Sequence, residues 1–588
     1  MTKKQYNQFD IKKYAIELKA LLRKVEEARN WDDNSLRKIL ADYPKDDAGF
    51  FSKDELVQGY AYLIAENELH DSQTIKDRIK MKPVRTISGV ATVTVLTKPF
   101  PCPGTCIFCP NDVRMPKSYL SDEPGAQRAE RNNFDPYLQT FNRLLALKNI
   151  GHNTSKVELI VLGGTWSFYP DEYQIWFVKE CFRAMNDFGI NDDRINIQTK
   201  NVFEEADRVP ARRHDGELRT YNNIIAEVQS QHSDAYISDS EKATWEELEA
   251  QHKINENAHS RCVGLVIETR PDYINPTEVI KIRRLGATKV QIGIQSLNDN
   301  VLEANKRGHN SKATRDAIKL LRLAGFKVHA HWMPNLYGST VAEDIKDYAR
   351  LWESEVAPDE LKIYPTSIID KTELYELYKR GMYTPYNYDE LLEVLTKTLP
   401  MTPRYCRLTR IVRDIPSTDI VAGNKLTNFR QIAEADLEKS GTPCQCIRCR
   451  EIKGTAVDFK ELELEIINYD TSMGKQLFIS YKTKTDDKIC GFLRLSLPND
   501  FNEVFIDEIK ECAMIREVHV YGKVVGIGTK QAGKSQHIGL GTKLIEMAEA
   551  LSKEAGYKKL SVISAIGTRE YYSKRGFAAQ GLYMNKSL

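Results

Sequence analysis

Three cysteines lie close together in Pro101-Cys102-Pro103-Gly104-Thr105-Cys106-Ile107-Phe108-Cys109-Pro110, with the spacing C-x3-C-x2-C. This spacing suits three corners of a four-iron cluster. Iron–sulfur clusters are normally held by four thiolates, so the loop leaves one iron for a substrate or cofactor to fill. The alternatives are three unrelated thiols or a zinc knuckle, but zinc needs a fourth ligand, and neither a second C-x2-C nor an H-x3-H arm follows Cys109. The stretch favours an open-cornered cluster.

Outward from this loop, residues 83–400 alternate between β-rich runs and helical patterns, which indicates parallel βα units. Six strands fit an open, partial barrel better than a closed barrel of eight. In barrel folds the chemistry gathers at the C-terminal strand ends, and the cysteine loop follows the first strand. The predicted strands are Thr94–Phe100, Val157–Trp166, Cys262–Pro271, Lys289–Ser296, Lys327–Pro334 and Glu360–Pro365.

Other strand ends also carry polar or small residues. Gly163 and Gly164 end the second strand, and adjacent glycines let a ligand approach the backbone closely, although such pairs are more often simple turns. His329 and His331 point to one face of the fifth strand by alternation, either as functional groups or as satisfied core histidines. Further polar residues at strand ends are Glu268-Thr269-Arg270-Pro271-Asp272, Gln291 and Gln295.

Residues 401–455 have a different character. The pattern C-x-C-x2-C at Cys444, Cys446 and Cys449 is a strong zinc signal that lacks only its fourth ligand. The alternative is reduced cysteines in an ordinary turn. Four arginines nearby predict a compact basic surface suited to phosphates; they are Arg404, Arg407, Arg410 and Arg413.

Residues 456–588 switch to alternating strands, and the turn Gln536–Thr542 opens a helix over Lys543–Lys553. A Q-x-x-G-x-G turn at a helix start points backbone N–H groups at a pyrophosphate, although most glycine-rich turns bind nothing. Strands are expected on both sides of this turn, at Glu517–Val520 and Leu560–Ala565. Together these features resemble the GNAT acetyltransferases, which bind acetyl-CoA.

The composition limits which partners and cofactors the protein can have. Lys plus Arg number 84 against 82 Asp plus Glu, so any RNA binding must come from local patches. The exit of the helical region 1–82 is one candidate patch, or else a solvated linker, with Arg78, Lys80, Lys82 and Arg85. Six of the 11 cysteines sit in two tight clusters, which indicates metal ligation rather than disulfides. No apolar stretch of about 18 residues occurs, so we expect a cytoplasmic protein without membrane contact.

The cysteine loop itself resembles the radical S-adenosylmethionine (radical SAM) superfamily. In that superfamily S-adenosylmethionine chelates the open iron and is cleaved to a 5'-deoxyadenosyl radical, and the turn at Gly163 and Gly164 would bind its methionine moiety. A radical SAM barrel joined to a GNAT domain is a rare combination. Linking phrases make the chain resemble the Elongator catalytic-subunit family from about residue 75 onward; they are Lys82–Val90, Asn255–His259, Glu268–Tyr273, Leu361–Thr366, Arg413–Pro416 and His519–Gly522.

The resemblance implies a tRNA carboxymethyluridine synthase. The radical would abstract hydrogen from the acetyl methyl of acetyl-CoA, the carbon radical would add to carbon 5 of the wobble uridine, and thioester hydrolysis would free CoA. The anticodon stem-loop would present the base unstacked. An electron donor, and either a homodimer or Elongator-like partner subunits, would complete the system.

The resemblance also assigns residues. Cys102, Cys106 and Cys109 would hold the cluster, and Cys444, Cys446 and Cys449 would hold zinc. The family's zinc histidine is missing from Gly423–Arg430, and Cys406 is a substitute to consider. Lys156 and Tyr572 would contact acetyl-CoA as catalytic residues. The cofactor contacts would be Glu517, Val518, His519 and Val520 with the pantetheine, and Leu540, Gly541 and Thr542 with the pyrophosphate.

The expected architecture is α/β: a partial (β/α)6 radical SAM barrel at 83–400, a zinc-binding bridge at 401–455 and a GNAT domain at 456–588, after a helical region at 1–82 that is a candidate for tRNA binding. Two rival functions remain. A protein lysine acetyltransferase would leave the cysteine loop idle and would need a base such as Glu517 or Glu570. A non-catalytic tRNA-binding scaffold would have a structural cluster, which usually has four protein ligands.

Overall fold

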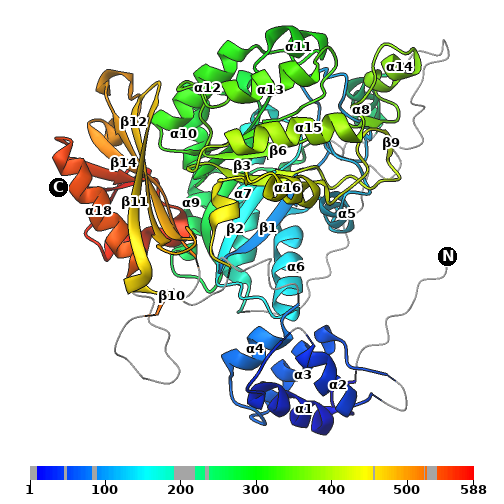
Figure 1. The fold of residues 1–588 in the computed structure, drawn as a ribbon, viewed down its shortest axis with the longest axis vertical. Coiled ribbons are helices and arrows are strands. Elements are labelled where there is room, and N and C mark those ends of the chain that lie inside the picture. Colours follow the sequence, from blue (N-terminus) through cyan, green and yellow to red (C-terminus); the bar gives the residue numbers. More distant parts are fainter. Residues whose placement is uncertain are drawn as a thin grey trace.

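A computed structural model describes residues 10–32, 34–45, 49–81, 89–190, 219–231, 237–453, 457–521, 524–525 and 539–588. Its amino-terminal helices form a small bundle set apart from the rest of the molecule (Figure 1). Apolar residues at helical spacing, such as Leu18, Leu21 and Leu22, are fully buried there. The bundle consists of α1 (Ala15–Glu27), α2 (Ser35–Asp42), α3 (Lys53–Ala65) and α4 (Gln73–Ile79).

The central sheet has seven parallel strands in the order β1-β2-β3-β4-β5-β6-β8. Its two edge strands, β1 and β8, do not pair with each other in this order, so the barrel is open. The strands are β1 (Ala91–Leu96), β2 (Lys156–Leu162), β3 (Arg261–Thr269), β4 (Lys289–Gln295), β5 (Lys327–Trp332), β6 (Glu360–Ile363) and β8 (Arg407–Ile411). The predicted partial barrel is confirmed.

The sequence missed β8, which lies inside the segment expected to be a bridge. Its residues Arg407-Leu408-Thr409-Arg410-Ile411 contain two arginines, so they read as a basic surface rather than a strand. The strand pairs with β6 from Glu360–Arg407 to Ile363–Ile411. The bridge is therefore partly built into the barrel sheet.

Helices cover the outer face of this sheet, and short elements surround its ends (Figure 1). The largest hydrophobic core lies between helices and sheet and includes Phe177, Ile292 and Trp332. A two-stranded antiparallel pair joins β7 (Ile368–Ile369) to β9 (Ile420–Ala422). The helices are α5 (Pro124–Arg131), α6 (Pro136–Asn149), α7 (Asp171–Asp187), α8 (Tyr221–Gln231), α9 (Trp245–Asn255), α10 (Pro276–Arg284), α11 (Asp299–Ala304), α12 (Ser311–Leu323), α13 (Val341–Arg350), α14 (Glu373–Lys379), α15 (Tyr388–Thr398), α16 (Phe429–Lys439) and α17 (Ile447–Arg450).

The carboxyl-terminal region is a second seven-stranded sheet, in the order β11-β12-β13-β14-β16-β18-β17. It is antiparallel except where β14 pairs with β16. Its elements are β11 (Leu462–Thr471), β12 (Gly474–Thr483), β13 (Ile489–Pro498), β14 (Cys512–Val520), α18 (Leu540–Glu554), β16 (Lys559–Val562), α19 (Arg569–Ser573), β17 (Ala578–Gln580) and β18 (Tyr583–Ser587); a further short pair joins β10 (Val457–Asp458) to β15 (Val524–Val525).

This second sheet packs on the amino-terminal ends of the barrel strands. Arg516 donates to the Phe326 carbonyl at 2.7 Å, just before β5, and Tyr583 donates to the Ala324 carbonyl at 2.8 Å. Arg283, at the end of α10, donates to the Ser564 carbonyl at 2.8 Å. The cysteine loop follows β1 at the opposite end of the barrel. The cysteine loop and the predicted acetyl-CoA region therefore lie at opposite ends of the barrel strands.

Among the residues that the structure describes, none belongs to a helix long and apolar enough to cross a membrane.

Candidate active site

A pocket opens at the carboxyl-terminal ends of the barrel strands and contains all three cysteines of the loop. The pocket is partly open to solvent. Successive strands contribute to its wall: β1 through the loop, β2 through Gly163 and Gly164, β3 through Glu268 and β4 through Gln295. The remaining lining residues are Gly104, Lys117, Ser118, Thr165, Thr269, Arg270, Gly293 and Arg307.

Hydrogen bonds from distant parts of the chain fix the cysteine loop. The Asn222 side chain exchanges two bonds with the backbone of Cys102, at 2.9 and 2.7 Å. The backbone of Ile107 accepts from Leu374 N–H at 2.9 Å and donates to the Asn305 carbonyl at 3.3 Å. Since α8 and α14 supply two of these partners, the loop is positioned by tertiary contacts on both sides.

Two arginines point at one of the thiols. Arg307 Nη1 lies 3.4 Å from Cys106 Sγ and Arg270 Nη1 lies 3.9 Å from it. A hydrogen bond from Cys109, together with the charges of Arg307 and Arg270, holds the pKa of Cys106 well below its usual value despite burial. Asp272 orients Arg270 through two bonds at 3.0 and 2.9 Å. The thiolate form that binds metal is thus favoured here.

Close packing explains two glycines of the pocket. Gly163 has a φ of +155°, and a Cβ there would lie 1.9 Å from Thr97 Oγ1. A Cβ on Gly104 would lie 2.2 Å from Arg270 Nη1. At Gly164 the nearest atom, Tyr169 Oη, would be at an ordinary 3.6 Å. Gly163 is therefore required by the turn itself, and Gly164 is left with room beside its backbone.

Polar side chains continue into the barrel beneath the pocket. His331 Nε2 and Gln291 Oε1 are 3.0 Å apart, and Lys362 Nζ donates to the same oxygen at 2.5 Å. Burial lowers the pKa of Lys362 to about 8 and holds the pKa of His331 well below its usual value. His329, one layer lower, meets Thr409 Oγ1 at 2.9 Å. Both histidines are buried and have hydrogen-bond partners, which agrees with the alternative that they are core histidines.

The second predicted cofactor site lies where two strands of the carboxyl-terminal sheet part. Strand β14 pairs with β16 only over residues 512–515, whereas its pairing with β13 extends to Val520. The register shifts opposite Arg494 and Leu495, a bulge that bends β14 away. Among the strands that the structure describes, residues 517–520 therefore have a neighbour on one edge only.

Helix α18 begins beside this open edge. Its first residues include Gly541, where a Cβ would lie 2.5 Å from Tyr571 Oη and 3.8 Å from Val520. Thr542 Oγ1 accepts from Arg575 at 2.8 Å, and the Arg575 guanidinium stacks on Tyr571 at 3.5 Å. A helix start with a nearby guanidinium can bind a phosphate. Gln536, His537 and Ile538 of the predicted turn lie outside the described residues.

The other predicted acetyl-CoA residues have distinct surroundings. Lys156 is exposed at the start of β2 and pairs with Arg261, against which Gly567 of the carboxyl-terminal region packs. Tyr572 is 8% exposed within the core of that region. The Glu517 side chain is bound to Lys327 at 2.5 Å and Arg494 at 2.9 Å. Glu517 can therefore offer its backbone to a ligand, but its carboxylate is already paired.

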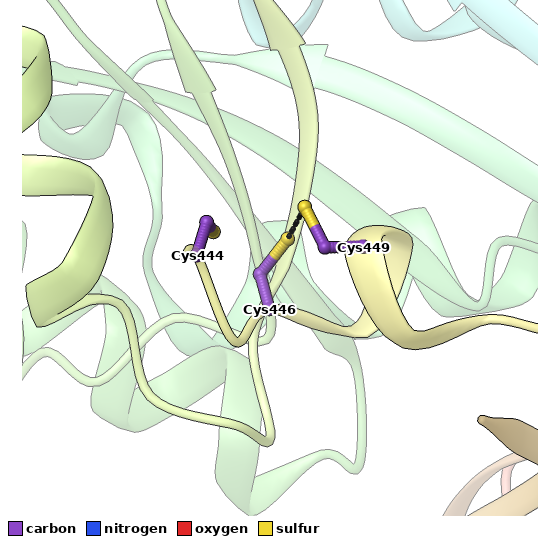
Figure 2. A group of neighbouring side chains, drawn as sticks. All are labelled: Cys444, Cys446 and Cys449. Atoms are coloured by element: carbon purple, nitrogen blue, oxygen red, sulfur yellow. Dashed lines mark hydrogen bonds between the residues drawn. The ribbon is translucent and has the colours of Figure 1, made fainter. Parts of the chain in front are cut away.

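The second group of cysteines is also brought together (Figure 2). The sulfurs of Cys444, Cys446 and Cys449 lie within 4.8 Å of one another, and those of Cys446 and Cys449 are 3.7 Å apart. A tetrahedral site with Zn–S bonds of about 2.3 Å places sulfurs about 3.8 Å apart. The arrangement fits zinc. Cys406 is fully buried nearby but is outside this group of mutual neighbours.

The predicted basic surface is wrong for most of its arginines. Arg404 pairs with Asp487, Arg407 with Glu451, and Arg413 with Glu123. The most exposed of the four, Arg410, pairs with Asp414 at 2.7 Å. Three of these four acids, all except Asp414, lie far away in the sequence, so the local pattern did not reveal them.

Within the amino-terminal patch, Arg78 is also engaged inside the protein. Arg78 donates to the carbonyl of Ala28 at 2.9 Å and stacks on Trp31, so it closes the helical bundle. Lys82 and Arg85 lie outside the described residues.

Sequence reasoning missed two charged residues of the pocket. Arg307 lies in the loop after α11, and Lys117 is buried with its amine bound to the Pro110 carbonyl at 3.1 Å. No short motif contains either residue together with its partners. In the sequence, each of the two residues is marked only by its charge: Lys117 follows the cysteine loop, and Arg307 lies in a loop after the fourth predicted strand.

Known proteins place this site in a family. Residues 203–351 match the model of the radical SAM superfamily, and residues 358–439 match the radical SAM C-terminal domain. The tRNA uridine(34) acetyltransferase of Methanocaldococcus jannaschii is 39% identical over 87% of this chain and 86% of its own. Elongator complex protein 3 of Danio rerio is 33% identical over 90% of this chain and 89% of its own. The chain belongs to the Elongator complex protein 3 (Elp3) family.

A solved Elp3 structure agrees with this chain in fold. The Methanocaldococcus infernus protein, with residues 1–46 deleted, covers 86% of this chain and all of its own, with a TM-score of 0.66 and 35% identity. The radical SAM superfamily match implies a four-iron cluster and S-adenosylmethionine as cofactors. The three cysteines that line the pocket provide the thiolate donors for the cluster.

Proposed function

We propose that this protein is a tRNA carboxymethyluridine synthase, which uses a 5'-deoxyadenosyl radical and acetyl-CoA to attach a carboxymethyl group to carbon 5 of the wobble uridine. One observation carries the proposal: three cysteines line a pocket at the carboxyl-terminal ends of the barrel strands, and the region packed on the other ends of these strands has residues 517–520 of β14 paired on one edge only, beside the start of α18. The relatives named as tRNA uridine(34) acetyltransferases support the choice of substrate.

Each pocket residue then has a role. Cys102, Cys106 and Cys109 hold the cluster, which together with S-adenosylmethionine supplies the radical. Arg307 and Arg270 balance the negative charge on the thiolates. The backbone at Gly163 and Gly164 accepts the methionine end of the cofactor, with room beside the Gly164 backbone.

The acetyl donor is held by the carboxyl-terminal region. The backbone of Glu517, Val518, His519 and Val520 pairs with the pantetheine arm along the open edge of β14. The start of α18, at Leu540, Gly541 and Thr542, holds the pyrophosphate, with Arg575 as an added cation. Lys156 and Tyr572 contact the thioester end. Cys444, Cys446 and Cys449 bind zinc and brace the segment between the two regions.

The wider proposal follows the predicted organisation. The helical region at 1–82 helps to bind the tRNA anticodon stem-loop, and residues 83–400 form the radical SAM domain together with β8 from the bridge. The bridge at 401–455 binds zinc, and residues 456–588 form a GNAT domain. A cytoplasmic reductant supplies the electron, and Elongator-like subunits or a second copy complete the assembly.

The decisive experiment is anaerobic reconstitution with S-adenosylmethionine, tRNA and acetyl-CoA deuterated in the methyl group. We expect deuterium in 5'-deoxyadenosine and a carboxymethyl group on the wobble uridine by mass spectrometry. Cys106→Ala should abolish both and leave acetyl-CoA affinity nearly unchanged, because the cysteine pocket and the proposed acetyl-CoA site lie at opposite ends of the barrel. Cys512→Ala, in the carboxyl-terminal sheet, is the matched control and should retain both products.

Other outcomes would favour the rivals. Acetylated protein lysine without tRNA product would indicate a lysine acetyltransferase. The pairing of the Glu517 carboxylate with Lys327 and Arg494 already disfavours Glu517 as the base of such an enzyme. Deoxyadenosine without deuterium and unmodified tRNA would reject acetyl-CoA as the hydrogen donor. Binding of tRNA without any cleavage of S-adenosylmethionine would indicate a scaffold.

A further inference from the structure

The three cysteines of the bridge leave one corner of a tetrahedral site to be filled. Burial and geometry already fit three zinc–sulfur bonds: Cys444 is 7% exposed, Cys446 is fully buried, and the Cys446–Cys449 distance is 3.7 Å. A structural zinc site is almost always closed by a fourth protein ligand. The helix α16 ends a few residues before Cys444, and its residues Arg430 and Glu434 contact Cys449.

A carboxylate on that helix touches the cysteines. Glu434 Oε1 lies 3.5 Å from Cys449 Sγ. With a Zn–S bond of about 2.3 Å and a Zn–O bond of about 2.1 Å, tetrahedral geometry places the two donor atoms about 3.6 Å apart. Like Cys406, Glu434 lies outside the group whose atoms are all within 4.8 Å, but its contact with Cys449 is the distance that shared coordination requires.

Arg430 holds the Glu434 carboxylate by a hydrogen bond, as residues around a metal site commonly hold the metal ligands. Its Nε donates to Glu434 Oε1 at 2.7 Å, and its Nη2 lies 3.7 Å from Cys449 Sγ. Its Nη1 donates to the Leu408 carbonyl of β8 at 3.0 Å. Ligating carboxylates are commonly held by such hydrogen bonds. The guanidinium also offsets negative charge, since three thiolates and one carboxylate exceed the charge of Zn²⁺ by two.

We propose that Glu434 is the fourth zinc ligand of this chain, completing a Cys3Glu site with Cys444, Cys446 and Cys449. The site ties α16 to the cysteine turn and, through Arg430, to the last strand of the barrel. Cys406 is then a buried core thiol, held through its backbone carbonyl by Ile447 N–H at 2.9 Å.

The test measures metal affinity rather than activity. All variants are made in the full chain with Cys106→Ala, which removes the other cysteine triad as a competing site. Zinc per chain is counted by elemental analysis, affinity is measured by competition with a chelator, and Co²⁺ titration reports the donor set through its visible absorption. Circular dichroism confirms that each variant remains folded.

We expect one zinc per parent chain. Glu434→Gln, which keeps the shape of the side chain, should weaken zinc affinity by more than about 100-fold. Loss of a residue that only hydrogen-bonds to a metal ligand already lowers metal affinity by about 10- to 100-fold, and loss of a ligand should cost more. Glu434→His should retain zinc and shift the cobalt spectrum toward a nitrogen donor. Glu438→Gln, one helical turn further on an exposed position of α16, is the matched control and should bind zinc as the parent does.

Three results would overturn the proposal. They are a parent chain that binds no zinc, a Glu434→Gln variant with parental affinity, and a Cys406→Ala variant that loses zinc while Glu434→Gln keeps it.

Discussion

Single charges shape the chemistry of the cluster pocket. Arg307 and Arg270 both face Cys106, and neither is free to turn away. The first donates to the Gly293 carbonyl at 2.7 Å and the second is held by Asp272. Fixed cations next to a thiolate stabilise additional negative charge without reorganising. They should therefore influence how readily a cluster at this position accepts an electron.

Replacing Arg307 by Gln should lower the reduction potential of the reconstituted cluster. A unit charge ~6 Å away stabilises an added electron by roughly 2–3 kcal/mol at an effective dielectric constant of 20, which is roughly 100 mV. Potentiometric titration followed by electron paramagnetic resonance measures the change. Arg380→Gln, on the exposed end of α14, is the control. An unchanged potential in Arg307→Gln would remove this arginine from the electrostatics of the pocket.

Lys362 should make the stability of the barrel depend on pH. Burial lowers its pKa to about 8 in the folded chain, against about 10.4 when unfolded. Between these values the unfolded chain binds more protons, so stability should rise as pH increases from 8 to 10, by up to roughly 3 kcal/mol. Lys362→Met should lack this rise.

The measurement is the urea midpoint of barrel unfolding at pH 7.5 and pH 10 for the parent and Lys362→Met. Lys379→Met, at an exposed position of α14, controls for loss of a lysine and should follow the parent. A difference between parent and Lys362→Met that is equal at both pH values would contradict the prediction.

At the level of elements, the cofactor site of the carboxyl-terminal region depends on where β14 leaves β16. The ladder between them stops at Ile515, and α18 starts beside the freed edge. Strand β14 alone does not make this site, and neither does α18. The bulge opposite Arg494 and Leu495 bends β14 away from β16, so that β14 and the start of α18 can face the same ligand.

Gly541→Glu should therefore impair acetyl-CoA binding specifically. Its Cβ would collide with Tyr571, and its carboxylate would repel a pyrophosphate at the helix start. We expect at least a tenfold loss of affinity, or about 1.4 kcal/mol, by calorimetry. Cleavage of S-adenosylmethionine should persist. Ala555→Glu adds the same charge at the exposed far end of α18 and should bind acetyl-CoA normally; equal affinities for the two variants would exclude the helix start from the site.

At the level of the whole molecule, buried ion pairs join the barrel to the carboxyl-terminal sheet. Asp359, at the start of β6, is fully buried and pairs with Arg516 of β14 and, at 3.5 Å, with Arg494 of β13. Burial alone would raise the pKa of Asp359, but the charges of Arg516, Arg494 and Arg322 outweigh it and hold the value at about 2. The two regions thus share one charge network.

Asp359→Asn should destabilise this junction strongly, because it leaves buried guanidinium groups without their partner. Removing one member of a buried ion pair typically costs about 3–5 kcal/mol. Thermal unfolding and limited proteolysis between the two regions measure the effect, and Asp507→Asn, at an exposed position, is the control. In the parent, the contribution of Asp359 is complete above about pH 4 and is lost as the pH falls toward 2. Parental stability in Asp359→Asn would show that the junction does not depend on this carboxylate.

The sequence by itself determined the features that local patterns encode. The C-x3-C-x2-C spacing predicted the donor set of the pocket, the alternation of apolar runs predicted an open parallel barrel, and the helix after Gly539 was expected within a few residues of its observed start. These succeed because ligand spacing, strand periodicity and helix starts depend on neighbouring residues. The strand β8 was missed because its arginines gave a polar pattern that only pairing with β6 explains.

Only the tertiary structure decided which charges remain available. Arg404, Arg407 and Arg413 looked like a surface for phosphates, but Asp487, Glu451 and Glu123 neutralise them from distant positions. The same long-range packing brings Arg307 to Cys106 and Glu434 to Cys449, and occupies the carboxylate of Glu517. Electrostatic partners are chosen by distance in space, and a chain that folds back on itself sets those distances without leaving a trace in the local sequence.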